Sequence, residues 1–168
     1  MKTQILALVL MVTALPAFGS DGGSSTAGVP NPSSKYCADV GGLNDMAVDR
    51  DHNQYGICRI GSAIIDTWTL WREKHGDHQV AVKKYLEGKR QLADAETTEQ
   101  GFETMAFLPN PASTFCLKAS GALQILSQPG GEFGLCRFAD GSSIEEWTLF
   151  SGPDAEGNAA LTKLLRSK

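Results

Sequence analysis

The chain has 168 residues, of which 42% are hydrophobic, and its 15 Lys and Arg are outnumbered by 19 Asp and Glu. The formal net charge is therefore −4. This sign argues against nucleic acid as a partner and gives no general attraction to anionic lipid, because both are held through basic surfaces.

The first 19 residues have the pattern of a secretory signal peptide. Lys2 supplies a basic start, residues 5–15 form an apolar run, and Ala17-Phe18-Gly19 offers small residues for cleavage. The run is too short to cross a bilayer, which needs roughly 20 residues; a buried N-terminal helix is the alternative. Residues 20–30 predict a flexible linker. We expect a periplasmic or secreted protein without a lipid anchor, because no Cys lies near the cleavage point.

The rest of the chain contains one sequence unit twice, over residues 31–74 and 109–153. Each copy begins Asn-Pro-x-Ser-x-aromatic-Cys, continues to aromatic-Gly-aliphatic-Cys-Arg, and closes on Trp-Thr-Leu-aromatic. The recurring pairs are Asn31 and Asn110, Cys37 and Cys116, Gly56 and Gly134, Cys58 and Cys136, Arg59 and Arg137, and Trp68 and Trp147. Chance is a poor explanation for so many anchors in the same order.

Each unit carries its own pair of cysteines. An even number of Cys in an exported chain predicts disulfides, and four Cys allow three pairings. The duplication favours Cys37 with Cys58 and Cys116 with Cys136 over bridges between the units. A site made of four zinc thiolates is the rival interpretation, but it needs close Cys pairs, which the chain lacks.

The order of elements predicted for each unit is helix, β-hairpin, helix. Asn31-Pro32 caps and starts the first helix, and the hairpin follows over residues 43–60 with its turn at 49–53. Ile64, Ile65, Trp68 and Trp71 then have the spacing of a helix that faces a core. In the second unit, residues 128–131 form the turn, and Ser142-x-x-Glu145 resembles a capping box.

Two further segments complete the predicted organisation. Residues 75–108 form a connector rich in helix-forming residues, and residues 154–168 predict a short amphipathic C-terminal helix. The fold class expected is α+β: two copies of a helix–β-hairpin–helix unit, each with one disulfide, joined by a helical connector. The sequence leaves open whether the copies pack as one domain or as two beads.

Metal and cofactor signals are weak. Asp49-x-Asp51-x-Asn53 resembles the start of a calcium loop, but Gln54 and Ile60 occupy positions that need Gly and Glu. His75 and His78 have no counterpart in the other unit. A polar turn and a solvated connection are the better interpretations, so we expect no metal and no other cofactor.

No motif of a nucleophile elbow, zinc protease, P-loop or dinucleotide site is present. Glu145-Glu146 is a carboxylate pair, but a helix N-terminus that favours acidic groups explains it without catalysis. We therefore expect a protein that is not an enzyme and has no catalytic residue.

Recurring polar and aromatic residues form a candidate binding surface. Its members are Arg59, Arg137, Asp66, Glu145, Trp68 and Trp147. Each Arg precedes an acid, and the alternative interpretation is a structural ion pair that fastens strand to helix. Each Trp is first a core anchor, but a partly exposed Trp is a natural hot spot for binding.

The repeated pattern resembles a bacterial family that carries the name hemolysin, whose members are short exported cysteine-containing domains of unknown function. Residues 110–150 match its Asn-Pro-Ala-Ser-x-aromatic-Cys, Gly-x-Cys-Arg and Asp-Gly-Ser-x-x-Glu-Glu-Trp pattern well, and residues 31–71 match more loosely. Relatives often carry two further cysteines that are absent here, which supports pairing within each unit. Many are lipoproteins, whereas this chain lacks the anchoring Cys. The resemblance brings no catalytic residues.

The function expected is an exported, non-enzymatic module that binds a protein or a cell-envelope ligand. A membrane-perturbing hemolysin is the alternative implied by the family name, although membrane insertion is not expected from a chain without a long apolar or basic amphipathic segment. An uncharacterised hydrolase is the second alternative. The oligomeric state stays open.

Overall fold

The structure is a computed structural model, and it describes residues 31–88 and 110–167. The predicted signal peptide, the predicted linker and residues 89–108 of the connector lie outside these ranges. The first copy consists of α1 (Pro32–Asp39), β1 (Leu43–Val48), β2 (Gln54–Ile60), β3 (Ala63–Asp66) and α2 (Thr67–Lys74), and α3 (Val80–Glu87) follows it.

The second copy has the same order of elements. It consists of α5 (Pro111–Lys118), β4 (Ala122–Gln128), β5 (Gly131–Arg137), β6 (Ser143–Glu145) and α6 (Glu146–Ser151), followed by a 3-10 turn at Glu156–Asn158 and by α7 (Ala159–Arg166). Asn31 and Asn110 cap α1 and α5 through their side chains, and Pro follows each at the helix start. The helix starts predicted from Asn-Pro are therefore confirmed.

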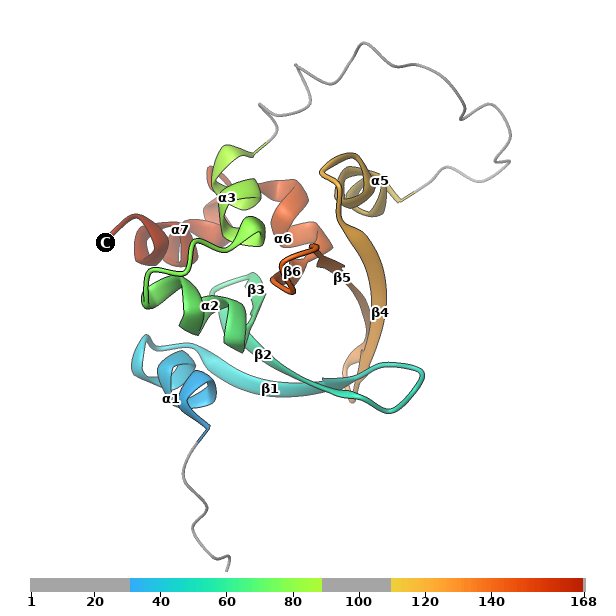
Figure 1. The fold of residues 1–168 in the computed structure, drawn as a ribbon, viewed down its shortest axis with the longest axis horizontal. Coiled ribbons are helices and arrows are strands. Elements are labelled where there is room, and N and C mark those ends of the chain that lie inside the picture. The colour runs from blue at the N-terminus through green and yellow to red at the C-terminus, as the bar shows by residue number, and fades with distance from the viewer. Residues whose placement is uncertain (1–30, 89–109, 168) are drawn as a thin grey trace, which may run out of the picture.

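The two copies together close one antiparallel barrel with the strand order β1-β2-β3-β6-β5-β4 (Figure 1). Two short pairings join the copies: Val48 with Ser127, and Ile65 with Ile144. In both pairings, the two residues occupy equivalent positions in the two copies. The copies are therefore related by an approximate two-fold axis. Closure removes the exposed edges that an isolated three-stranded sheet would present.

This barrel shows that the predicted fold class was wrong. The hairpin strands over 43–48 and 54–60 were predicted correctly, but each copy also contributes a third strand, which the helix–hairpin–helix prediction lacked. Ile64 and Ile65 fit the spacing of a helix when read with Trp68 and Trp71, yet they belong to β3. A four-residue strand is too short for its alternation to be recognised, and its partner in the other copy is 79 residues away.

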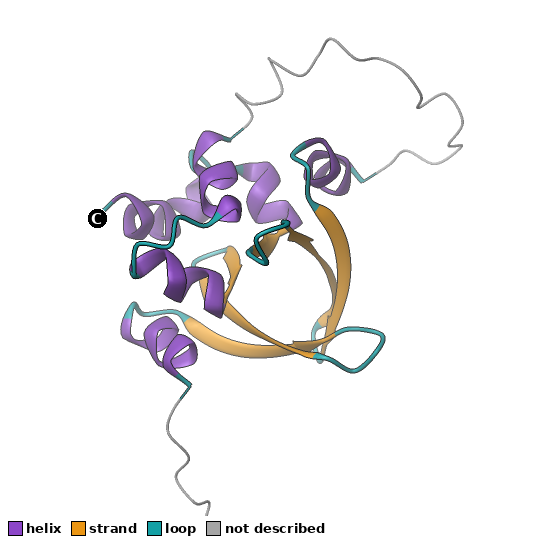
Figure 2. Cartoon of the chain, viewed as in Figure 1, coloured by secondary structure: helices purple, strands orange, loops and turns teal. Residues whose placement is uncertain are grey.

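Alternation along the strands divides the apolar side chains into two clusters. A small cluster inside the barrel contains Ala47, Ile57, Leu126 and Leu135. A larger cluster lies between the barrel wall and the helices, which gather on one side of the barrel (Figure 2). Tyr85 of α3 and Leu161 of α7 are buried in this second cluster, so both helices cover the shared barrel.

Both predicted disulfides are confirmed. Cys37–Cys58 joins α1 to β2, and Cys116–Cys136 joins α5 to β5; all four sulfur-bearing side chains are buried. A glycine follows each first helix because a Cβ at Gly42 or Gly121 would overlap a bridge sulfur. The bridges thus attach each first helix to the second strand of its hairpin.

Candidate binding surface

The recurring acids lie beneath the surface and cap helices. Asp66 ends β3, and its carboxylate accepts hydrogen bonds from the backbone N–H of Thr69 (2.7 Å) and from its hydroxyl (3.0 Å). Glu145 ends β6 and accepts from the N–H groups of Trp147 (2.9 Å) and Thr148 (2.7 Å). Asp66 is 9% exposed and Glu145 is 5% exposed. Neither carboxylate is therefore available to a partner at the surface.

The recurring arginines do not pair with these acids. Arg59 Nε lies 2.9 Å from Asp45 Oδ2, because the register of β1 and β2 pairs Arg59 with Leu43, two residues along β1 from Asp45. Arg137 is exposed, and no carboxylate among the described residues lies within ion-pair distance of it. The structure therefore separates Arg59 and Arg137 from Asp66 and Glu145.

A reciprocal threonine contact joins the two copies under the helices. The hydroxyl of Thr69 accepts a hydrogen bond from the backbone N–H of Ser143, and that of Thr148 accepts one from Ile64, both at 2.9 Å. Each hydroxyl in turn donates to its own capping acid. This role was not predicted, although the Thr of Trp-Thr-Leu recurs in both copies.

Burial makes the pH dependence of the two caps predictable. Desolvation raises the pKa of Glu145 above its usual 4.5 and the pKa of Asp66 above its usual 3.8, against the hydrogen bonds that lower both. The folded state therefore holds these protons more tightly than the unfolded state. The stability that the folded state gains by binding these protons is fully present at a pH below the ordinary pKa values. It is lost as the pH rises through the raised pKa values.

We expect Glu145→Gln to flatten the pH profile of stability in that window. The measurement is denaturant unfolding between mildly acidic and neutral pH, with wild type and variant compared at each pH. The wild-type protein should lose stability relative to the variant as the pH rises. Parallel profiles would contradict the assignment of this pH dependence to Glu145.

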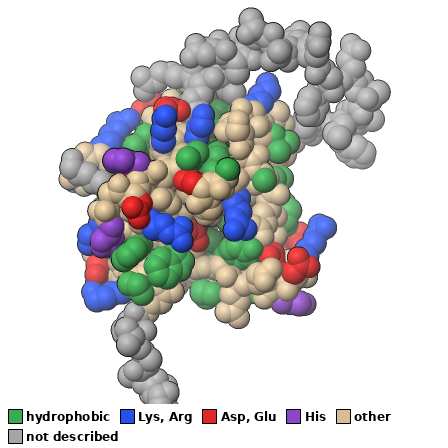
Figure 3. Space-filling view, in the orientation of Figure 1, with side chains coloured by type: hydrophobic (Ala, Val, Ile, Leu, Met, Phe, Trp, Pro, Cys, Tyr) green, Lys and Arg blue, Asp and Glu red, His purple; other side chains and the backbone are tan. Residues whose placement is uncertain are grey.

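The recurring tryptophans are exposed at equivalent places. Trp68 is 36% exposed and Trp147 is 47% exposed, each one residue into the helix that follows the third strand. Hydrophobic side chains gather over α1, α2 and the start of β1, with Lys or Arg side chains beside them (Figure 3). Trp68 and Trp147 are the members of the predicted surface that combine exposure with a large apolar side chain.

The solvent-facing side chains of α2, together with Tyr36 of α1 against Lys74, form an outer surface that we name the α2 face. Its members are Tyr36, Trp68, Trp71, Arg72, Lys74 and His75. The rings of Trp68 and Trp71 meet edge to face at 5.5 Å, and the ring of His75 lies 4.0 Å from that of Trp71. The guanidinium of Arg72 lies 5.8 Å from the Trp68 ring centroid, and Lys74 Nζ lies 4.3 Å from that of Tyr36.

The corresponding surface of the second copy is named the α6 face, and it consists of Trp147 and Phe150. The Trp147 and Phe150 rings meet edge to face at 5.7 Å, and Phe150 packs against buried Phe115 at 5.9 Å. Ser151 occupies the position of Arg72, so this face repeats the aromatic pair without the cation.

The carboxylate pair of the second copy has a structural role. Glu146 is buried and accepts hydrogen bonds from Asn110 Nδ2 (3.0 Å) and Ser113 Oγ (2.5 Å), which attach α6 to the start of α5. A Cβ at Gly134 would lie 2.5 Å from the Glu146 carboxyl carbon, which explains the recurring glycine of β5. Glu145 thus caps the start of α6, and Glu146 binds the start of α5.

The calcium-like segment forms a hydrogen-bonded hairpin turn. Asp49 accepts from the backbone N–H groups of Asp51 and Asn53, and from the side chains of Asn53, Tyr55 and Gln124. The side-chain hydrogen bond from Asn53 is the main cause that lowers the pKa of Asp49 to about 2. Within residues 31–88 and 110–167, no three His, Cys, Asp or Glu side chains gather as metal ligands.

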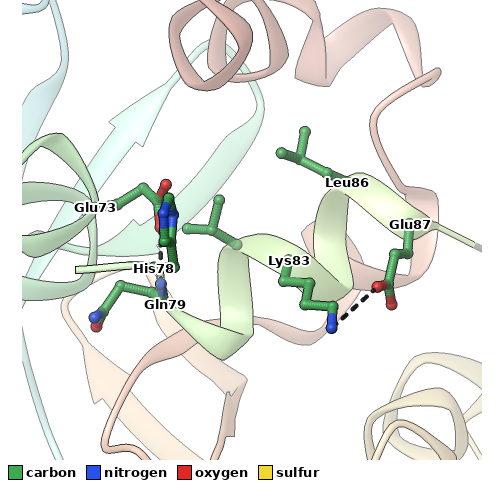
Figure 4. Close-up of a pocket in the computed structure, with 7 residues that line it drawn as sticks. Glu73, His78, Gln79, Lys83, Leu86 and Glu87 are labelled. Atoms are coloured by element: carbon green, nitrogen blue, oxygen red, sulfur yellow. Dashed lines mark hydrogen bonds and ion pairs between the residues drawn. The ribbon is translucent and has the colours of Figure 1, made fainter. Parts of the chain in front are cut away.

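A hollow of about 380 Å³ lies along α3 and is lined by Glu73, His78, Gln79, Val82, Lys83, Leu86 and Glu87 (Figure 4). Lys83 Nζ and Glu87 Oε1 are 3.8 Å apart at its edge, and the Glu73 carboxylate accepts from the Gln79 N–H at 2.8 Å. None of the predicted site residues lines it.

The described ranges also contain no helix with the length and apolarity needed to cross a bilayer.

These features define a class of protein: a disulfide-bonded barrel of two tandem copies with an exposed Trp on each. The chain belongs to the family of the domain of unknown function DUF333, which matches residues 28–74 and 108–153. The two matches coincide with the two copies identified in the sequence. Neither the curated proteins nor the solved structures gave a match.

Proposed function

We propose that this protein is an exported, non-enzymatic module that binds a protein or cell-envelope partner through its α2 and α6 faces. The observation that carries the proposal is the exposure of Trp68 and Trp147 at equivalent positions of both copies. Tryptophan loses little conformational entropy on binding and contributes a large contact area, so it is enriched at binding hot spots. Two disulfides support an oxidising compartment such as the periplasm or the extracellular space.

The test is affinity capture from an envelope extract. Tagged wild-type protein should retain a partner that the double variant Trp68→Ala, Trp147→Ala loses. Leu117→Ala is the matched control, because Leu117 is an exposed apolar residue of α5 that belongs to neither face. Retention of the same material by wild type and double variant would overturn the proposal.

The name hemolysin, carried by the family that the repeat resembles, supplies the alternative function. Dye release from liposomes at micromolar protein tests it, and we expect none. Release by the wild-type protein would replace partner binding with membrane perturbation as the function of this module.

A further inference from the structure

We propose that the α2 face binds an acidic peptide segment of the partner, whereas the α6 face makes an uncharged apolar contact. This inference rests on the proposed function and specifies the chemistry of the partner at one of the two faces. Three observations support it: the unpaired cations of the α2 face, the way its rings are covered, and the contrast with the α6 face.

The α2 face carries positive charge on a protein whose net charge is −4. Trp68, Trp71, Arg72 and His75 follow one another at helical spacings of three and four residues, so they share one side of α2. Among the described residues, no carboxylate lies within ion-pair distance of Arg72 or Lys74. Asp66 senses the charge of Arg72, but it is buried and held by Thr69.

The rings of the α2 face already carry cations or imidazole against one side. Arg72 lies over Trp68, Lys74 over Tyr36, and His75 against Trp71. A sugar would have to compete for those ring faces in order to stack. A peptide carboxylate can instead approach the cations and the positively polarised ring edges, while its aliphatic carbons contact the exposed part of Trp68.

The α6 face provides a comparison within the same molecule. Trp147 and Phe150 occupy the positions of Trp68 and Trp71, but Ser151 and Pro153 replace Arg72 and Lys74. Both faces can therefore bury apolar groups, and only the α2 face can select carboxylates. Two cations on a net-negative protein are too few to hold a nucleic acid or an anionic membrane, whose binding needs more extensive basic surfaces.

The experiment is a binding titration of the full mature chain at low salt with short poly-L-glutamate, followed by calorimetry and Trp fluorescence. Wild type should bind poly-L-glutamate, and added salt should weaken the binding. Arg72→Gln with Lys74→Gln should lower the affinity about tenfold or more. Lys118→Gln with Lys163→Gln changes the net charge equally at exposed positions elsewhere and should leave the affinity within about twofold.

Three results would overturn the inference: no binding of poly-L-glutamate, equal loss of affinity in both double variants, or binding of polyglucuronate in preference to poly-L-glutamate. The last result would identify a carboxylated glycan as the partner. None of them overturns the proposed function, because capture from envelope extract can still depend on Trp68 and Trp147. The proposed function fails only if capture from envelope extract does not depend on Trp68 and Trp147, and the capture experiment measures this separately.

Discussion

Replacing Thr69 and Thr148 together with valine will lower the free energy of unfolding by about 4 kcal/mol, or about 2 kcal/mol for each site. Valine preserves the shape of threonine but removes the hydroxyl. The backbone N–H groups of Ser143 and Ile64 then lose their 2.9 Å acceptors. Asp66 and Glu145 each lose a donor as well. Both threonines, Ser143 and the two capping acids are buried, so water cannot replace most of the lost partners without opening the junction between the copies.

Denaturant unfolding of the two single variants and the double variant measures this effect. Thr114→Val is the matched control, because Thr114 donates only to the Asn110 carbonyl within the first turn of α5. The control should change stability by less than about 0.5 kcal/mol. A double variant as stable as this control would show that the reciprocal contacts do not hold the copies together.

Removing either disulfide by Cys-to-Ala replacement of both partners will cost about 3 kcal/mol. The bridges span 21 and 20 residues, so the two losses should be nearly equal if they arise from the unfolded chain. Both bridges are also buried beside a glycine whose missing side chain makes room for the sulfur atoms. Deleting the sulfurs therefore leaves space that the neighbouring glycines cannot fill.

Equilibrium unfolding of Cys37→Ala with Cys58→Ala, and of Cys116→Ala with Cys136→Ala, provides the measurement. Loops of nearly equal length predict nearly equal entropic losses of stability. A clear difference between the two measured losses would therefore come from the folded state and not from the unfolded chain. A loss below about 1 kcal/mol for either pair would contradict the prediction for that bridge.

Local features were predictable because their causes lie within a few residues. The Asn-Pro helix starts, both hairpin strands of the first copy and the pairing of cysteines within each copy follow from capping, alternation and duplication. Trp68 and Trp147 were predicted first as core anchors, and that prediction is wrong because both side chains are exposed. Their exposure could not be predicted, because an amphipathic spacing does not state which neighbours will cover a given side chain.

The sequence by itself determined that this protein is a tandem duplication with one pair of cysteines in each half, because a repeat and its cysteine spacing are properties of the linear chain. Only the tertiary structure decided that the halves share one closed barrel, that Asp66 and Glu145 are buried caps, and that Arg59 pairs with Asp45. The physical reason is the distance along the chain. Ile65 and Ile144 are 79 residues apart, and no local pattern records that two short edges will pair across that separation.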